Sequence, residues 1–443
     1  MASKLQSLFL NAVLSRTARN VSRGLHETRR RLLRRPHAVS AFLQLDDPYS
    51  YLLGHYLPSL REHYGVELRL YLSEALGGAY QPAPELLAEY AVRDSERLAR
   101  ELGIPFLDKG ASPPVEHRRS MLDTLASCRQ DAGFDEELLQ GLGAFWRGDA
   151  EAASRRSASA EMRGLSDVAF QESQEVRSRL GHYNSAMLHY AGEWYWGVDR
   201  LPYLLRRLDD LALAKDKPHH PLLSSVGQAM DVTLPVAPPT AAKGLPPLEY
   251  FHSIRSPYSY LGLRRVAEIA NAFGLQLKVR PVLPMVMRGM QVPRAKLLYI
   301  IKDAAREAER RGIRIGRIAD PVGAGVERSL AVFCYAESQH RGTEFLINVG
   351  EAVWCTAIDV ATDAGMRKVT AKTGLAWPEV QNAMKSRGWR DVAAENRDSM
   401  MSSGSWGVPT MRLGDFVAWG QDRDWLLVRH LEEHCNAGDG ILV

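Results

Sequence analysis

SPYSYL, residues 256–261, decides how this chain of 443 residues is interpreted, because a near copy, DPYSYL, stands at residues 47–52. The copies begin 209 positions apart and differ only at their first residue, which is Ser256 in one and Asp47 in the other. A hydroxyl can donate a hydrogen bond, whereas an ionised carboxylate only accepts one. The pair predicts a duplicated domain with one working site and one site that has changed or lost its role.

The repeat extends over the whole chain. Four residues of the first half recur 209 positions later, and near the end of each half the spacing grows to 223. Insertions in loops produce such a drift, so we interpret the halves as diverged copies of one fold. The recurring pairs are Tyr90 and Tyr299, Asp94 and Asp303, Arg97 and Arg306, Gly103 and Gly312, then Gly181 and Gly404, Trp196 and Trp419, Gly197 and Gly420, and Arg200 and Arg423.

Strand and helix signals alternate in the second half. Residues 248–254 are typical of a buried strand, residues 258–273 of a helix with one apolar stripe, and residues 275–280 of another strand. A charged helix is predicted at residues 295–311, and helical patterns continue to about residue 400.

A hairpin and a helix are predicted near the end of the chain. Short apolar runs at residues 410–413 and 416–419 flank Gly414-Asp415, which favours a tight turn, and a last helix is predicted at residues 423–433. The order strand, helix, strand, helical insert, strand, strand, helix is typical of a thioredoxin-like fold with a helical subdomain inserted in its middle. Its parallel βαβ unit predicts a site at the strand ends.

Composition marks the domain boundaries. Residues 215–247 contain seven prolines and little periodicity, which indicates a partly extended linker. We therefore predict a basic amphipathic segment at residues 1–37, a degenerate first domain at 38–214, this linker, and a second domain at 248–443. The predicted fold class is α/β, with two thioredoxin-like domains that each carry an inserted helical subdomain.

Residues 1–37 carry nine Lys or Arg residues and a single acidic residue, Glu27. Five apolar residues of this segment fall on one helical face. Three interpretations stay open: a mitochondrial-type transit peptide, an amphipathic helix that binds a membrane surface, or an arm packed on the body or left as a loose tail. The apolar residues are Leu5, Leu8, Phe9, Ala12 and Val13.

Composition and charge argue against several classes of protein. The remaining 406 residues carry 47 basic and 51 acidic side chains, which gives no electrostatic case for nucleic acid. No apolar run approaches the roughly 20 residues of a membrane-spanning helix. Four scattered cysteines without a C-x-x-C motif fit a reducing compartment. We expect a cytoplasmic protein, with the mitochondrion or a membrane surface as alternatives.

A metal site is not expected. The H-x-x-E-H pattern at residues 430–434 resembles a zinc-protease motif. It lies on the predicted last helix, without any protease-like context.

Ser256 follows a predicted strand, and Pro257 opens the predicted helix. A serine in this place is a good helix N-cap, which is a purely structural role. The N-terminus of a helix also presents unpaired N–H groups and a partial positive charge, which stabilise a bound thiolate. A serine hydroxyl can donate a hydrogen bond to such a thiolate and lower the pKa of the thiol further.

Further motifs follow this tract in a definite order. They are RP at residues 280–281, QVP at 291–293, KLLY at 296–299, WGVPT at 406–410 and WGQDR at 419–423. Each motif is weak by itself, but the combination is fairly specific. With these motifs, residues 248–434 resemble the glutathione-dependent 2-hydroxychromene-2-carboxylate isomerases and the kappa-class glutathione transferases, which belong to the DSBA-like branch of the thioredoxin superfamily.

This resemblance implies glutathione as the cofactor. Ser256 would hydrogen-bond the glutathione sulfur, Pro409 would be a cis-proline beside it, and the backbone of Val408 would pair with the cysteine of glutathione. Gln421 and Asp422 would hold the γ-glutamyl end, where a carboxylate can pair with the ammonium group. Asp422 could instead simply cap the last helix.

The resemblance also implies a substrate site. Lys296, Gln291 and Tyr258 match positions that are expected to line it. For Lys296 the alternative is an ordinary solvated lysine on the surface of a helix.

The first half lacks the matching groups. Asp47 replaces Ser256, Ala186 stands opposite Pro409, and Leu87 stands opposite Lys296. A carboxylate repels a thiolate but still caps a helix, so the fold can survive the loss. We interpret this half as a structural or regulatory pseudo-domain, with a different binding function as the alternative. Duplication also makes an intrachain pseudo-dimer plausible.

The function implied by the resemblance is isomerisation of a small aromatic-derived acid by a glutathione thiolate. The rivals are a kappa-type transferase that acts on an electrophile, a protein related to the DSBA-like disulfide oxidoreductases, and a non-catalytic thioredoxin-fold binding protein. Ser256 and Ser259 occupy the places where the oxidoreductases have cysteines. Direct thiol–disulfide exchange would therefore have no nucleophile.

Overall fold

The computed structural model describes residues 14–106, 118–149, 159–216, 221–313 and 315–439. The described chain divides into two compact units. The first unit contains residues from 20 to 231, and the second contains residues up to 19 together with those from 232 onward. The boundary at residue 231 falls inside the segment that was predicted to be a linker.

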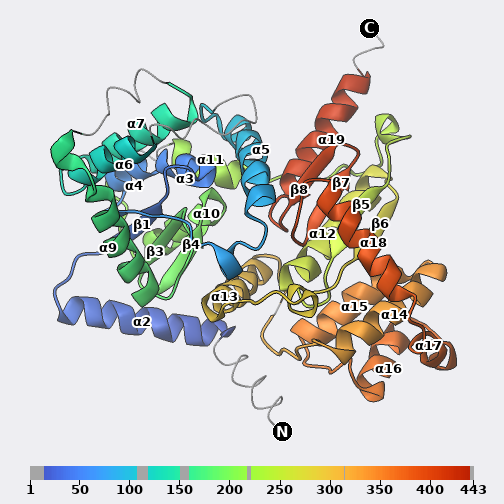
Figure 1. The fold of residues 1–443 in the computed structure, drawn as a ribbon. Coiled ribbons are helices and arrows are strands. Elements are labelled where there is room, and N and C mark those ends of the chain that lie inside the picture. Colours follow the sequence, from blue (N-terminus) through green and yellow to red (C-terminus); the bar gives the residue numbers. More distant parts are fainter. Residues whose placement is uncertain (1–13, 107–117, 150–158, 217–220, 314, 440–443) are drawn as a thin grey trace. The chain divides into compact units, whose positions relative to one another are not determined.

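A four-stranded mixed sheet forms the centre of the second unit (Figure 1). Its strand order is β6-β5-β7-β8, in which β5 and β6 are parallel and the other two pairings are antiparallel. The strands are β5 (Leu248–His252), β6 (Leu277–Pro281), β7 (Thr410–Leu413) and β8 (Phe416–Trp419). The predicted sequence of strands along the chain is therefore present, and both hairpin strands begin and end where the pattern placed them.

Helix α12 (Pro257–Phe273) connects the two parallel strands. Ser256 caps its N-terminus, and Gly274, with a φ of 68°, ends it in the left-handed conformation that glycine adopts without strain. The apolar stripe of the helix, which includes Val266 and Phe273, is buried. Local sequence signals thus place Ser256 just beyond the end of β5.

The helical insert lies between β6 and β7. Figure 1 shows α14 to α17 gathered as one helical group to one side of the sheet. The helices that follow β6 are α13 (Arg294–Arg310), α14 (Ala324–Ser338), α15 (Gly342–Trp354), α16 (Asp363–Lys372), α17 (Trp377–Ala383) and α18 (Trp389–Ser402), with α19 (Asp424–Asp439) after β8. The short 3-10 turns of this unit are η4 (Thr240–Ala242) and η5 (Met285–Arg288).

The first unit contains a sheet of the same design. Its order is β2-β1-β3-β4, with β1 and β2 parallel and the other two pairings antiparallel. The strands are β1 (Ala38–Leu43), β2 (Glu67–Leu72), β3 (Met187–Tyr190) and β4 (Glu193–Trp196). The two sheets therefore match strand for strand.

The helix after β1 differs from its counterpart in the second unit. It is broken into α3 (Pro48–Gly54) and α4 (Leu57–His63), whereas α12 is continuous. Pro58 stands where α12 has Ala267, and a proline cannot continue a helix because it lacks the N–H donor and its ring clashes with the preceding turn. The break in the helix therefore has a direct cause in the sequence.

The remaining helices of the first unit surround its sheet (Figure 1). They are α5 (Pro84–Leu102), α6 (Arg118–Ser127), α7 (Phe134–Trp146), α9 (Leu165–Arg179), α10 (Leu201–Asp209) and α11 (Pro221–Ala229), with the 3-10 turns η1 (Gly78–Tyr80), η2 (Ala160–Met162) and η3 (Val198–Arg200). Helix α11 lies in the segment that was expected to be partly extended. It buries Leu223 and Val226 and packs against α10, so part of this segment belongs to the first unit.

Helix α2 (Arg16–Leu32) precedes the first sheet and has no buried residue. The apolar face that was predicted around Leu5, Leu8, Phe9, Ala12 and Val13 lies outside the described residues. Among the described helices, none is long and apolar enough to span a membrane.

Candidate functional site

Ser256 lies half-buried at the N-terminus of α12. Its Oγ accepts a hydrogen bond of 3.1 Å from the backbone N–H of Ser259. This bond uses a lone pair of the oxygen and leaves the hydroxyl proton for a second partner. The N-cap role is therefore present, and it is compatible with donation to a bound anion at the same helix end.

The sheet brings the Val408–Pro409 segment to the same edge as Ser256. Phe251 of β5 pairs with Thr410 of β7, so Pro409 enters β7 beside the point where β5 leaves toward α12. The peptide bond between Val408 and Pro409 is cis. Val408 is half-buried against Phe251, Val282 and Met400. Two segments about 150 residues apart in sequence thus meet at one end of the sheet, the arrangement expected for the strand ends of such folds.

Lys296 also reaches this segment. Its Nζ lies 5.6 Å from the centroid of the Trp406 ring, a cation–π distance. Burial lowers the pKa of the Lys296 ammonium group. Trp406 is itself buried, and its Nε1 has no hydrogen-bond partner among the described residues. Lys296 is therefore a partly desolvated cation beside the loop that carries Val408 and Pro409, and it is not a solvated surface lysine.

Gln421 and Asp422 follow β8 and are both buried. The Gln421 amide donates to Glu307 at 2.9 Å and accepts from Arg311 at 2.7 Å. Its side chain therefore ties the start of the last helix to α13. The role of Gln421 as a glutathione ligand stays a prediction, and the contacts that the structure gives it are structural.

Asp422 lies beside Arg423, with 3.7 Å between its Oδ1 and the guanidinium nitrogen. The backbone N–H of Gly420 donates to the carbonyl of Pro409 at 2.9 Å. This bond fixes the segment that carries Asp422 against the Val408–Pro409 segment. Asp422 is thus held near the predicted site, and its carboxylate is already next to a cation.

The two other predicted substrate residues lie in different surroundings. Tyr258, in the first turn of α12, donates its hydroxyl to Asp303 of α13 at 2.7 Å. Gln291 is exposed in the segment between η5 and α13. The structure therefore joins Tyr258 to the scaffold of the site and leaves Gln291 at the surface.

Arg255 is a residue of this region that the sequence patterns did not single out. It immediately precedes Ser256 and forms a bidentate ion pair with Asp320, with both N···O distances at 2.7 Å. Asp320 lies in the segment before α14, so the pair links the loop of Ser256 to the helical insert. No local pattern signals this pair, because its partners are 65 positions apart.

Cys355, which contacts Tyr260 of α12, does not resemble a nucleophile. Cys355 Sγ lies 3.6 Å from the hydroxyl of Tyr260, and burial raises the pKa of its thiol. A raised pKa reduces the thiolate fraction, and the thiolate is the reactive form.

The first unit also has a residue that caps the helix after its first strand, but the capping group is a carboxylate and not a hydroxyl. Asp47 caps α3 by accepting from the backbone N–H of Tyr49 at 3.2 Å and from the Ser50 hydroxyl at 2.7 Å. Burial raises the pKa of the Asp47 carboxyl to about 6. At neutral pH this carboxylate accepts hydrogen bonds and has no proton to donate to a thiolate.

Ala186, which the sequence alignment placed opposite Pro409, makes an equivalent backbone hydrogen bond. Gly197 donates to the carbonyl of Ala186 at 2.7 Å, the same bond that Gly420 makes to Pro409. Ala186 has a φ of 52°, so its backbone has a left-handed conformation that is unusual for alanine. The backbone at this point of the first unit therefore differs from that of the second unit.

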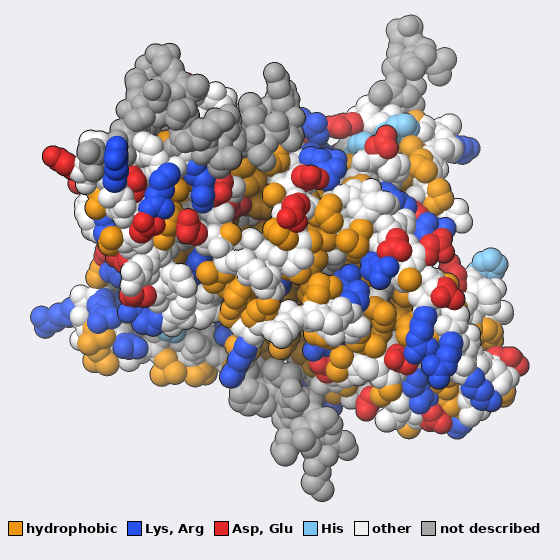
Figure 2. All heavy atoms as spheres, in the orientation of Figure 1, with side chains coloured by type: hydrophobic (Ala, Val, Ile, Leu, Met, Phe, Trp, Pro, Cys, Tyr) orange, Lys and Arg blue, Asp and Glu red, His pale blue; other side chains and the backbone are white. Residues whose placement is uncertain are grey.

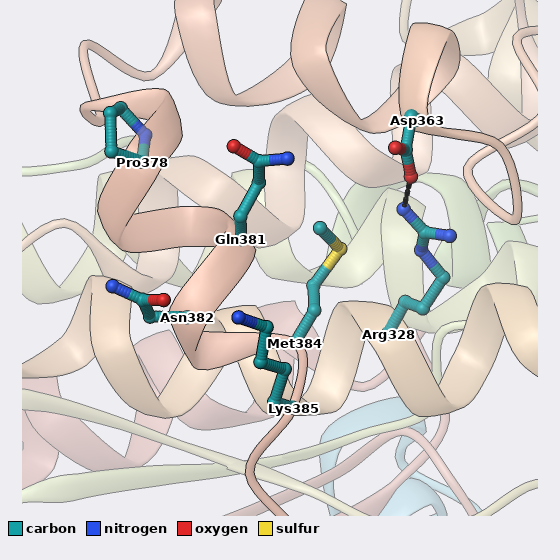
Figure 3. Close-up of a pocket in the computed structure, with 7 residues that line it drawn as sticks. All are labelled: Arg328, Asp363, Pro378, Gln381, Asn382, Met384 and Lys385. Atoms are coloured by element: carbon teal, nitrogen blue, oxygen red, sulfur yellow. Dashed lines mark hydrogen bonds and ion pairs between the residues drawn. The ribbon is translucent and has the colours of Figure 1, made fainter.

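A surface pocket of about 460 Å³ lies in the helical insert (Figure 3). Arg328 and Asp363 form an ion pair at its rim, shown by the dashed line, and its other lining residues come from α17 and the turn that follows. These residues are Pro378, Gln381, Asn382, Met384 and Lys385. None of the predicted site residues lines this pocket.

Comparison with known proteins places the second half in a family. Residues 248–432 match the family model of the DSBA-like thioredoxin domain. The chain is 24% identical over 196 residues to the 2-hydroxychromene-2-carboxylate isomerase of Pseudomonas putida, in an alignment that covers 42% of this chain and 95% of that protein. The second half is a DSBA-like thioredoxin domain with homology to this isomerase, as its motifs predicted.

Two solved structures are also similar. A 2-hydroxychromene-2-carboxylate isomerase matches with a TM-score of 0.39 and 23% identity, over 44% of this chain and 99% of that one. The cytosolic disulfide reductase DsbM from Pseudomonas aeruginosa matches with a TM-score of 0.32 and 18% identity, over 42% of this chain and 99% of that one.

Proposed function

We propose that the second unit binds glutathione at the N-terminus of α12 and catalyses a glutathione-dependent isomerisation of the 2-hydroxychromene-2-carboxylate isomerase type. The observation that carries the proposal is the meeting of Ser256 with the Val408–Pro409 segment at one end of the sheet. The similarity of this half to the isomerase from Pseudomonas putida supports the choice of reaction.

The residues present fit a bound tripeptide thiol. The hydroxyl proton of Ser256 can point to a sulfur, because the bond from Ser259 already occupies a lone pair of the oxygen. The backbone of the half-exposed Val408 can pair with a peptide in the manner of an added strand. The side chain of Asp422 can pair with an ammonium group.

Bound glutathione would supply a thiolate that adds reversibly to an unsaturated acid and is released unchanged after rotation about the former double bond. Ser256 and the N-terminus of α12 would keep the sulfur ionised through a hydrogen bond and a favourable partial charge. Lys296 would hold the carboxylate of the acid, because a partly desolvated ammonium group binds an anion more strongly than a solvated one.

The first unit is proposed to be a supporting copy that no longer binds glutathione. Its sheet has the same order, and its Asp47 occupies the cap position of Ser256. An ionised Asp47 would repel a thiolate at the same helix end. This half would contribute to stability or regulation and not to the reaction.

The first test is glutathione titration by calorimetry on the full chain. Wild type is expected to bind, and Ser256→Ala is expected to bind at least about tenfold more weakly, since it loses a charge-assisted hydrogen bond. Ser256→Ala also removes a helix cap, so Thr362→Ala, which removes the cap of α16 in the same unit, is the matched control. Absence of binding by wild type would disprove the proposal.

Asp47→Ser tests the role of the first unit. If this change alone adds a second glutathione site, the first unit is a recently altered copy of the same site. If the number of glutathione molecules bound per chain stays the same, the first unit also lacks other groups of the site, such as a proline equivalent to Pro409.

A thiol assay distinguishes the isomerase from a transferase. An isomerase regenerates glutathione, so the free-thiol concentration stays constant while the substrate disappears. Net consumption of thiol with an aromatic electrophile would instead favour the kappa-type transferase.

A further inference from the structure

Helix α2 turns its apolar side toward solvent. Val21, Leu25 and Leu32 are 57%, 66% and 78% exposed. Their spacings of four and seven residues place them on one face of the helix. A surface helix of a globular protein normally buries such a stripe, so this orientation requires an explanation.

The opposite face of α2 makes the contacts that hold it in place. Arg23 forms a bidentate ion pair with Glu193 of β4, and on the same side of the helix Glu27 and Arg30 pair with each other at 2.7 Å within α2. Arg23, Glu27 and Arg30 are half-buried, whereas the apolar residues are exposed. The helix is therefore attached to the first unit through its charged face, and the apolar face is left for another partner.

The charge around this stripe identifies the chemistry of the partner. Residues 16–35 carry eight arginines and one acidic residue, Glu27. Arg29 and Arg31 are exposed and flank the stripe on its two sides. Figure 2 shows hydrophobic and basic side chains next to each other along the lower left edge, where α2 lies in Figure 1. An apolar stripe bordered by arginines complements an interface that is apolar inside and anionic outside.

We infer that α2 docks this protein on the surface of a lipid bilayer that carries anionic headgroups. Val21, Leu25 and Leu32 would enter the boundary between headgroups and acyl chains, and the arginines would contact the phosphates. The protein would lie on the membrane without crossing it.

The same charges argue against a second copy of this chain as the occupant. Two α2 helices facing each other would bring twelve arginines against two glutamates. Nucleic acid is also a poor match, because it offers phosphates but no apolar layer for the exposed stripe.

The test is co-sedimentation of the full-length protein with vesicles of phosphatidylcholine alone or with about 30% phosphatidylglycerol, a composition that provides an anionic surface. Wild type is expected to sediment with the anionic vesicles and much less with the neutral ones. The triple variant Val21→Ser, Leu25→Ser, Leu32→Ser is expected to lose at least about tenfold in partition coefficient. The double variant Arg29→Gln, Arg31→Gln is expected to bind the anionic vesicles more weakly, and its binding is expected to fall less steeply as the salt concentration rises.

The matched control is Val168→Ser with Val236→Ser, because both valines are exposed but lie outside α2. It should bind vesicles as wild type does. Circular dichroism must show the same helix content in all variants, which the outward position of the changed side chains leads us to expect. Equal sedimentation of wild type and the triple variant would overturn the inference. So would a concentration-dependent dimer of wild type that the triple variant abolishes while neither binds vesicles.

Discussion

The hydroxyl of Tyr258 donates a hydrogen bond of 2.7 Å to the carboxylate of Asp303. At a spacing of 209 residues, the hydroxyl of Tyr49 donates to Asp94 at 2.9 Å. In each unit the bond joins the first turn of the helix after the first strand to the long helix beyond the second strand. It therefore fixes the helix whose N-terminus carries Ser256 or Asp47.

Tyr258→Phe and Tyr49→Phe are expected to lower the free energy of unfolding by similar amounts, about 1–2 kcal/mol each, because each leaves a buried aspartate without one donor. Urea unfolding measures both. If Tyr258 only positions α12 through its bond to Asp303, Tyr258→Phe also weakens glutathione binding slightly and leaves KM for the acidic substrate unchanged. A rise in KM alone, with normal stability, would instead assign Tyr258 to the substrate site.

Gln421→Ala is expected to destabilise the second unit by about 1–3 kcal/mol, since it leaves the buried Glu307 and Arg311 with one partner fewer. Gln381→Ala, at an exposed glutamine of α17, is the control and should change stability by less than about 0.5 kcal/mol. Thermal unfolding checks both. Loss of glutathione affinity at unchanged stability would contradict the structural role that we assign to Gln421.

Asp47→Asn is expected to change how stability depends on pH. Burial raises the pKa of Asp47 from 3.8 to about 6, so the folded chain holds this proton more tightly than the unfolded chain. The stabilisation from this group is present in full below pH 3.8 and is lost as the pH rises through 6. Asparagine keeps the cap and cannot ionise.

The variant should therefore be more stable than wild type at pH 8, by about 1–2 kcal/mol, and little different at pH 4. Chemical unfolding at the two pH values measures the difference. A variant that is destabilised more at pH 8 than at pH 4 would show instead that the fold stabilises Asp47 as a carboxylate.

Lys296→Met is expected to raise KM for an acidic substrate about tenfold or more, because it removes the cation beside Trp406. Lys302→Met, at an exposed lysine on the same helix, is the matched control and should leave KM unchanged. Steady-state kinetics with 2-hydroxychromene-2-carboxylate checks both variants. Equal changes of KM in the two variants would contradict a role of Lys296 in binding the substrate.

Much of the second unit was predictable because its signals are local. Ser256 and Pro257 start a helix through capping and a fixed φ, and Gly414-Asp415 turns a hairpin between two short apolar runs. The segment expected to be a linker was less well predicted. Its prolines indicated extension, but Leu223 and Val226 gain enough burial against the first unit to stabilise α11.

The sequence by itself determined the order of strands and helices in the second half and the difference between Ser256 and Asp47, since capping, periodicity and turn chemistry act between near neighbours. Only the tertiary structure decided that Gln421 is held by Glu307 and Arg311, more than a hundred positions away, and that Arg255 is held by Asp320. It also decided that α2 presents its apolar face outward. The reason is physical: which polar groups are paired, and which face of a helix is buried, depends on segments that meet only after the chain has folded.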